Sequence, residues 1–129
     1  MKVIIAGGRN YNFKQSDFDL LDYISTKWQI SEIVSGGADG ADFGGEVWAE
    51  NKKIPVKKFP ANWKEYGKVA GPIRNAEMAA YSDGVILFPG GKGTTNMFET
   101  AKEFCLEILI IKNGKAFQHN YKKNCEEVE

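Results

Sequence analysis

The chain has 129 residues, of which 43% are hydrophobic, 12% aromatic and 26% charged. This length and composition are typical of one globular domain and disfavour a disordered, collagenous or coiled-coil chain. The 17 basic side chains balance the 17 acidic ones, so the chain lacks the excess positive charge that favours binding to duplex nucleic acid or to a membrane surface.

Short aliphatic runs alternate with segments of helical periodicity, which is typical of an α/β protein. The runs predict five strands, at residues 2–6, 32–35, 56–59, 84–88 and 107–111. Between the first two runs, Phe18, Leu21, Ile24 and Trp28 share one face of a helix predicted to begin at Ser16. Because strands joined by helices run parallel and need cover on both faces, we expect a three-layer Rossmann-like sandwich with a mostly parallel sheet of about five strands.

Two segments show no clear period. Residues 60–70 form the longest connection and carry Trp63 and Tyr66, so we interpret this connection as a lid loop. Its aromatic rings either stack on a base or, as such side chains do more often, fill a local cluster. The polar residues 113–129 are expected to form a surface appendage of unassigned conformation after a nucleotide-binding domain of residues 1–112.

Glycine-rich turns follow three of the predicted strands: GGRN after the first, SGGADGAD after the second and PGGKGTTN after the fourth. In an open α/β sheet, ligands bind beyond the carboxyl ends of the strands. Glycine lets backbone N–H groups approach an anion, and a helix that begins after the turn adds its positive end. Three such turns at one edge predict a site for a phosphate or a similar anion, although chain reversal alone would explain any one of them.

The standard nucleotide motifs do not fit these turns. The Walker spacing fails because Lys92 is followed by Gly93 and because Ile86 stands where the first glycine of the motif belongs. The dinucleotide fingerprint fits Gly91 and Gly93 but fails at Asn96, where its third glycine should be. These departures exclude the kinase and the NAD-dependent dehydrogenase interpretations.

Arg74 lies in the string GPIRNAEM, where Pro72 suits the first turn of a predicted helix. A guanidinium offers paired donors to a phosphate or a carboxylate, so Arg74 is a candidate anion clamp beside the glycine turns. The spacing is equally compatible with a surface ion pair between Arg74 and Glu77, three residues further on.

Other kinds of site lack their residues. Cys105 and Cys125 have no CxxC spacing and His119 is the one histidine, so both a zinc site and a Ser-His-Asp triad are disfavoured. We expect no metal and no cofactor, and we favour a core thiol at Cys105 and a tail thiol at Cys125 over a disulfide. No apolar run approaches the ~20 residues that span a bilayer, and the opening MKVIIAGGRN becomes polar too early for a signal peptide. We therefore expect a cytoplasmic protein.

The strings SGGADGAD, GPIRNAEM and PGGKGTTNM together resemble the SLOG superfamily, most closely its YspA-like branch, over about residues 2–112. The resemblance implies a Rossmann-like domain that binds a nucleotide or a nucleotide-derived ligand, and it implies a homodimer. Our first hypothesis is therefore a sensor, carrier or sequestering module for such a small molecule. The candidate ligand-binding residues lie in the glycine turns and around Arg74: Gly7, Gly8, Arg9, Ser35, Gly36, Gly37, Ala38, Asp39, Arg74, Asn75, Pro89, Gly90, Gly91, Gly93, Thr94, Thr95 and Asn96.

A more distant resemblance, to the LOG phosphoribohydrolases, implies an enzymatic alternative that cleaves the N-glycosidic bond of a nucleotide. Met97 stands where that family has its catalytic glutamate. A carboxylate stabilises the oxocarbenium-like ribosyl centre of such a reaction, whereas a thioether does not, so Met97 is expected in the core or the pocket wall. The arginine and the phosphate turn of that family are matched here by Arg74, Pro89, Gly90, Gly91, Gly93 and Thr94.

An enzyme of this kind needs another acid. Glu99 lies about 200° round the helix from Met97, and its spacing from Asn96 fits a capping box. Asp39 and Asp42 are the candidate catalytic acids beside Arg74, although roles as helix cap and first-turn acid explain them slightly better. A third hypothesis is single-stranded DNA binding, because the DprA proteins carry a similar SGGA turn, but the neutral net charge disfavours it.

Overall fold

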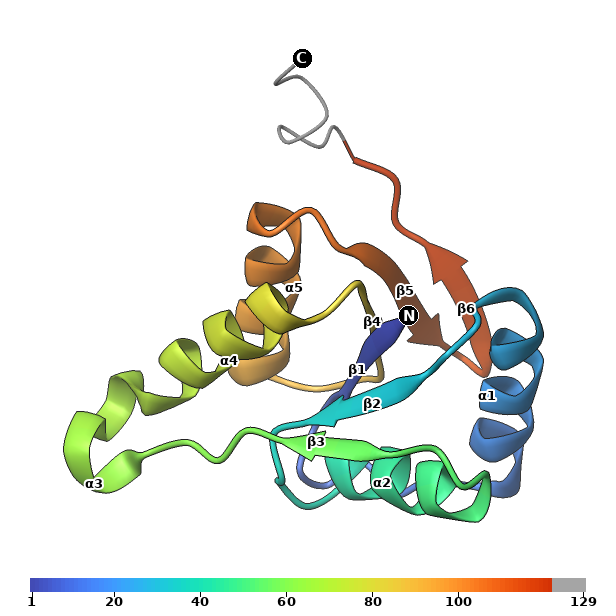
Figure 1. Cartoon of the computed structure of the whole chain (residues 1–129), viewed down its shortest axis with the longest axis horizontal. Coiled ribbons are helices and arrows are strands. Elements are labelled where there is room, and N and C mark those ends of the chain that lie inside the picture. Colours follow the sequence, from blue (N-terminus) through green and yellow to red (C-terminus); the bar gives the residue numbers. More distant parts are fainter. Residues whose placement is uncertain (122–129) are drawn as a thin grey trace.

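The computed structural model describes residues 1–121, and in this part of the chain a six-stranded sheet lies between two layers of helices (Figure 1). The strands are β1 (Lys2–Ala6), β2 (Glu32–Ser35), β3 (Val56–Lys58), β4 (Gly84–Leu87), β5 (Glu107–Lys112) and β6 (Lys115–Gln118). The helices are α1 (Gln15–Lys27), α2 (Ala41–Asn51), α3 (Trp63–Tyr66), the 3-10 helix η1 (Gly67–Val69), α4 (Ala70–Tyr81) and α5 (Lys92–Glu103).

The strand order is β3-β2-β1-β4-β5-β6, and only the β5–β6 pair is antiparallel. From β1 the chain builds the sheet first toward β3 and then, after β3, returns to the other side of β1 at β4. This confirms the Rossmann-like α/β sandwich that the sequence predicted. The topological switch between β1 and β4 is where ligands bind in folds of this kind.

The sheet has one strand more than the sequence predicted. β6 lies within the segment expected to be a surface appendage, and it pairs with β5 in the register Ile111 to Ala116. The turn between them is Asn113-Gly114, and both residues have positive φ, 53° and 74°. An Asn-Gly pair favours the tight two-residue hairpin turn that matches the twist of the strands, so this local signal was present in the sequence but was not used.

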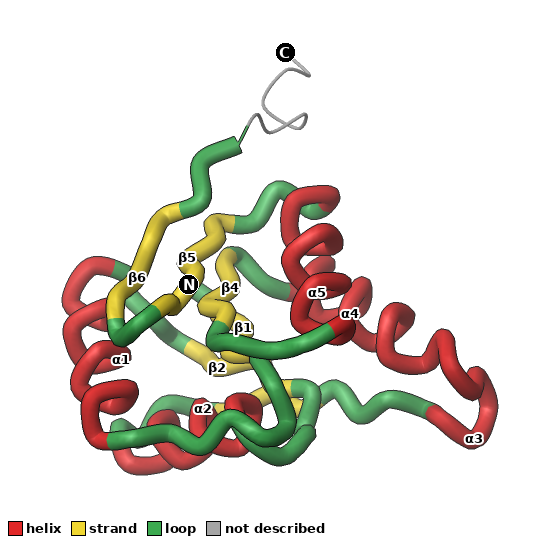
Figure 2. Tube along the Cα trace, turned by 180° about the vertical axis from the view of Figure 1, so that it is seen from behind, coloured by secondary structure: helices red, strands yellow, loops and turns green. Residues whose placement is uncertain are grey.

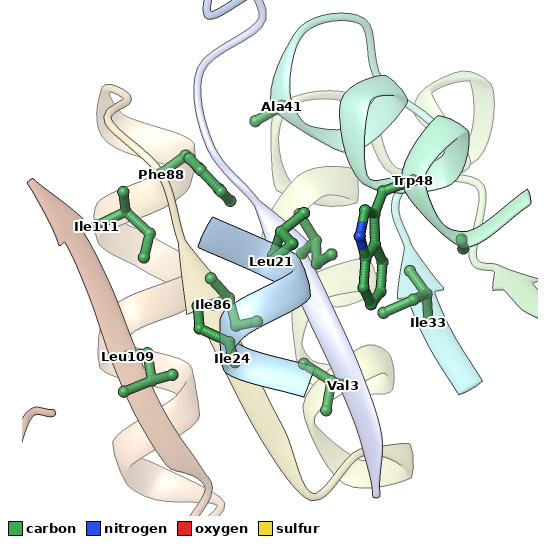
Figure 3. Packing of buried hydrophobic residues seen from close by; sticks show 12 residues of the cluster. Val3, Leu21, Ile24, Ile33, Ala41, Trp48, Ile86, Phe88, Leu109 and Ile111 are labelled. Atoms are coloured by element: carbon green, nitrogen blue, oxygen red, sulfur yellow. The ribbon is translucent and has the colours of Figure 1, made fainter. Parts of the chain in front are cut away.

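The core has two parts, one on each face of the sheet. On one face, Val3 and Ile86 pack with Leu21 of α1 and Trp48 of α2 (Figure 3). On the other face, Ile4 and its neighbours pack against α4 and α5. Successive residues of β1 therefore point to opposite helical layers, as the two-residue period of a strand requires.

Residues 60–70 are not the irregular loop that we expected. They include α3 and η1, which continue directly into α4 and extend away from the sheet (Figures 1 and 2). The side chain of Asn62 accepts a hydrogen bond from the N–H of Glu65, 3.1 Å away, and thereby caps α3. This local cap begins the helical segment of α3 and η1. Each of these helices is too short to produce a recognisable helical period in the sequence.

Two further observations concern the chemistry of the chain. Cys105 is disulfide-bonded and does not carry the free core thiol that we expected, whereas the expectation for Cys125 lies outside the described residues. No helix in residues 1–121 combines the length and the apolar character that crossing a bilayer requires.

Gly45 tests the packing of α2 against β1. A Cβ on this buried residue would lie 2.7 Å from Ile5 Cγ2. We expect the cost of this overpacking to exceed the helix-propensity gain of roughly 1 kcal/mol, so Gly45→Ala should lower the free energy of unfolding by a net amount of about 1–2 kcal/mol. Gly93→Ala is the matched control, because a Cβ there would meet nothing within 4 Å. Urea unfolding curves measure both variants, and equal stability of the two would contradict this account.

Candidate functional site

A cavity of about 480 Å³ lies beyond the carboxyl ends of β1 and β4, at the topological switch of the sheet. Residues from all three predicted glycine turns, from α3 and η1, and from α4 contribute to its wall. It is lined by Ala6, Gly7, Gly8, Arg9, Ala38, Asp42, Trp63, Lys68, Gly71, Pro72, Arg74, Asn75, Met78, Gly91, Lys92, Gly93, Thr94, Asn96 and Met97. The three turns that are distant in the sequence therefore meet at one cavity.

The N-terminal end of α5 carries unpaired backbone donors into this wall. Gly91 is the N-cap residue, and the first bond within the helix runs from the N–H of Thr95 to the carbonyl of Gly91 over 3.0 Å. The N–H groups of Lys92, Gly93 and Thr94 consequently have no acceptor within the helix. A helix of 12 residues adds the positive end of its dipole at the same point, an arrangement that favours an anion.

Arg74 is held in the wall by two hydrogen bonds. Its Nη1 donates to the carbonyl oxygen of Gly36 over 2.8 Å, and its Nε donates to Asn75 Oδ1 over 3.1 Å. A guanidinium has five N–H donors, so three of them stay available to a ligand. The alternative surface pair with Glu77 is absent from the ion pairs of residues 1–121.

Asn75 connects Arg74 to the first turns of α5. Its amide is buried, with the residue 5% exposed, and its Nδ2 donates to Asn96 Oδ1 over 2.9 Å and to the carbonyl of Gly93 over 3.4 Å. One side chain thus fixes the guanidinium relative to the bare N–H groups. The capping box that we predicted from Asn96 and Glu99 is wrong, because α5 begins four residues earlier, at Lys92, and Glu99 instead pairs with Lys102.

Several of the predicted glycines serve close packing around the cavity. A Cβ on Gly36 would lie 2.5 Å from Arg74 Nη1, and a Cβ on Gly90 would lie 2.7 Å from the backbone nitrogen of Gly8. The N–H of Gly8 already donates to the carbonyl of Pro89 over 2.8 Å. A second, smaller pocket adjoins this cavity at the carboxyl end of β2. The predicted residues that line neither space are Ser35, Pro89, Gly90, Thr95 and Tyr66.

Positive charge gathers at the cavity although the whole chain has a formal net charge of +0. Four basic side chains, Arg9, Lys68, Arg74 and Lys92, line it together with the single carboxylate of Asp42. Lys68 was missed at the level of sequence, because nothing in the order of residues shows that η1 borders the cavity. Lys92 was overlooked although it lies within the predicted PGGKGTTN turn. Clustering of this kind strengthens the local field and attracts anions.

Asp42 and Asp39 have different environments, although only three positions separate them. Asp42 is 6% exposed, lies in the first turn of α2 and accepts the N–H of Ala38 at Oδ2 over 3.2 Å. Burial raises the pKa of Asp42 to about 6, although the hydrogen bond from Ala38 and the charge of Arg74 both act to lower it. Asp39 is exposed and does not cap α2, whose N-cap is Gly40. Burial also lowers the pKa of Arg74.

The apolar part of the cavity wall comes from Met97, Met78 and Trp63 of α3. Met97 is 1% exposed and belongs to the same core cluster as Met78, so it is both core residue and pocket wall. Trp63, half of whose surface is exposed, lines the cavity, whereas Tyr66 does not. The position expected to hold a catalytic glutamate in a LOG-like enzyme therefore presents a thioether.

Within residues 1–121 no three His, Cys, Asp or Glu side chains come together as a metal site.

Comparison with known proteins gives one family and one relative. The model of the YspA, cpYpsA-related SLOG family matches residues 1–66, the half of the chain that includes β1, β2 and their glycine turns. The Gene 61 protein of Mycobacterium phage D29 is 30% identical over 117 residues, which cover 84% of this chain and 94% of that protein. No solved structure matches the chain significantly.

The burial of Asp42 predicts a pH-dependent effect on stability. Because the pKa of Asp42 in the folded protein is about 6 and thus above its ordinary value of 3.8, its contribution to stability is fully present below pH 3.8 and is lost as the pH rises through 6. Asp42→Asn removes this loss. The variant should gain about 2 kcal/mol relative to the wild type between pH 4 and pH 8, at 1.36 kcal/mol per pKa unit, because the unfolded carboxyl is already more than half ionised at pH 4.

Urea unfolding of both proteins at pH 4 and pH 8 measures this gain. Asp39→Asn removes an exposed carboxylate from the same loop and provides the baseline for losing one negative charge. An effect of Asp42→Asn that is equal at the two pH values would show that the carboxylate is not held in a desolvated position.

Proposed function

Because this chain belongs to the YspA, cpYpsA-related SLOG family, we propose that it binds a nucleotide or a nucleotide-derived small molecule in the cavity beyond the carboxyl ends of β1 and β4. Membership in the family suggests a nucleotide-related function. The observation that carries the proposal for this site is that the bare N–H groups of α5 and the guanidinium of Arg74 line one cavity. Backbone donors at a helix N-terminus and an arginine are both phosphate-binding groups.

The two kinds of wall suggest an orientation for the ligand. In the proposal, a phosphate accepts hydrogen bonds from Gly93 and Thr94 at the start of α5 and from the free donors of Arg74. The base then packs against the apolar side of the cavity, which includes Trp63 and Met97. An aromatic ring provides a large flat surface for such packing, and the basic side chains around the mouth favour the approach of an anion.

Binding without turnover is the role that we favour. Met97 presents no carboxylate to a ribosyl centre, and every group that the binding proposal requires already lines the cavity. We therefore propose a sensor, carrier or sequestering module, in which the bound state of the protein is itself the output.

Nucleoside monophosphates should raise the melting temperature of the protein. A ligand at a hundredfold excess over its Kd stabilises the folded state by about 2.7 kcal/mol, which corresponds to roughly 10 °C for a chain of this length. Arg74→Ala should abolish the shift. Gly36→Ala should reduce it strongly while retaining the charge, because the new Cβ would displace Arg74 Nη1, only 2.5 Å away.

The control for these two variants is Lys27→Ala, which removes a cation at the end of α1, on the opposite edge of the sheet. Differential scanning fluorimetry with adenosine, guanosine, cytidine and uridine monophosphates and with inorganic phosphate measures all the shifts in melting temperature. The proposal fails if no nucleotide shifts the wild type, or if Arg74→Ala responds as the wild type does.

One observation favours a second candidate function, the hydrolysis of an N-glycosidic bond. Asp42 is buried in the wall of the same cavity, and its pKa is raised to about 6, so it holds a proton in mildly acidic solution. Such a carboxylic acid can protonate a departing base as the C1′–N bond breaks. The bonding electrons pass to the base nitrogen, and water adds to C1′ and loses a proton to the Asp42 carboxylate, which restores the acid.

If Asp42 is this acid, a nucleoside monophosphate incubated with the protein releases free base, and the rate falls as the pH rises above about 6. Asp42→Asn should lose at least a hundredfold in rate. Asp39→Asn is the matched control and should keep most of the activity, because Asp39 does not line the main cavity. Chromatography of the products measures the reaction, and intact substrate after prolonged incubation with the wild type would eliminate this candidate.

A further inference from the structure

A second pocket of about 220 Å³ adjoins the cavity at the carboxyl end of β2. The two share Arg9, Ala38, Trp63 and Arg74 as wall residues. Asp39 lies in the wall of the second pocket alone. A molecule that extends past Arg74 from the main cavity would therefore enter this pocket.

Two consecutive backbone donors of the loop after β2 are already engaged. The N–H of Gly37 donates to Ser35 Oγ over 3.0 Å, and the N–H of Ala38 donates to Asp42 Oδ2 over 3.2 Å. This is the opposite of the start of α5, where three N–H groups have no acceptor within the helix. The loop after β2 therefore lacks the row of free amides that would make a second phosphate site.

Besides Arg74, two charged side chains of opposite sign and one aromatic ring are left for a ligand. Asp39 is an exposed carboxylate that only accepts hydrogen bonds, and Arg9 only donates them. Neither residue takes part in an ion pair within residues 1–121. Trp63, 50% exposed, supplies the ring.

This set of groups selects the chemistry of the occupant. A second phosphate would be attracted by Arg9 and Arg74, but an ionised phosphate only accepts hydrogen bonds and would leave the Asp39 carboxylate without a donor. An apolar group would strip water from the charged side chains without replacing its hydrogen bonds. Hydroxyl groups donate to a carboxylate and accept from a guanidinium. A ring that carries hydroxyls also has an apolar C–H face, which can pack on the part of the Trp63 indole that borders the second pocket, while the base packs on the part that borders the main cavity.

We infer that the second pocket binds a sugar ring, so that the ligand is a nucleotide whose phosphate group is esterified to a second sugar. The inference rests on the proposed function, because it takes the phosphate at α5 and Arg74 as given. Arg74 lies in the wall of both spaces and has three N–H donors left after its bonds to Gly36 and Asn75. It is therefore placed to contact the phosphate that joins the two halves of the ligand.

Three matched pairs of probes test the inference: ADP with ADP-glucose, GDP with GDP-mannose, and UDP with UDP-glucose. Isothermal titration calorimetry on the full chain gives the Kd of each. For at least one base, the member with the sugar should bind the wild type about tenfold more tightly than the free diphosphate.

Asp39→Ala separates the sugar from the phosphate. The variant should weaken binding of the sugar nucleotide about tenfold, because it removes the acceptor for the hydroxyls. It should leave binding of the free diphosphate unchanged or slightly tighter, because a negative charge near the site is lost. Glu103→Ala, at the far end of α5, is the control for removing an exposed carboxylate and should change neither Kd.

The outcomes distinguish the two proposals. If diphosphates and monophosphates bind but no sugar nucleotide binds more tightly, or if Asp39→Ala weakens both members of a pair equally, the sugar subsite is wrong and the proposed function stands. If no nucleotide of any kind binds, both proposals are overturned. A sugar preference that disappears in Asp39→Ala supports the subsite.

Discussion

The cavity depends on the hydrogen bonds of the buried side-chain amide of Asn75. Its Oδ1 accepts a hydrogen bond from Nε of Arg74, and its Nδ2 donates to Asn96 Oδ1 and to the carbonyl oxygen of Gly93. A buried amide is costly unless it is paired, so these bonds restrict how α4 and α5 can lie against each other. The guanidinium and the bare N–H groups of α5 are consequently presented together, and a ligand finds both in place without first ordering them.

Electrostatics at the cavity differ from those of the chain as a whole. Four basic side chains lie around the cavity in a protein with a formal net charge of +0, so the attraction of anions is local. Asp42 lies in the wall of the same cavity, and its burial raises its pKa. An anion bound nearby would favour the protonated form of Asp42 still further, which couples the occupancy of the cavity to pH.

The glycines of the three turns have separate physical roles. Gly36 leaves space for Arg74, and Gly90 lets the loop after β4 approach the loop after β1. Gly93, in contrast, faces open space at the start of α5. A pattern of glycines at a sheet edge thus predicts where a ligand site lies, but only some of these residues are available to contact a ligand.

The sequence by itself determined the α/β sandwich, the positions of five strands and the gathering of the glycine turns at one edge of the sheet, because these follow from local periodicity and from the rules of parallel sheets. It left Arg74 open between this edge and a surface pair with Glu77. The Asn113-Gly114 turn to β6 was equally local and was overlooked. Tertiary structure alone decided that Asp42 is buried while Asp39 is exposed, that Asn75 joins α4 to α5, and that Lys68 reaches the cavity. These features depend on contacts between segments that are distant along the chain, and residue spacing carries no information about the distances and solvent exposure such contacts create.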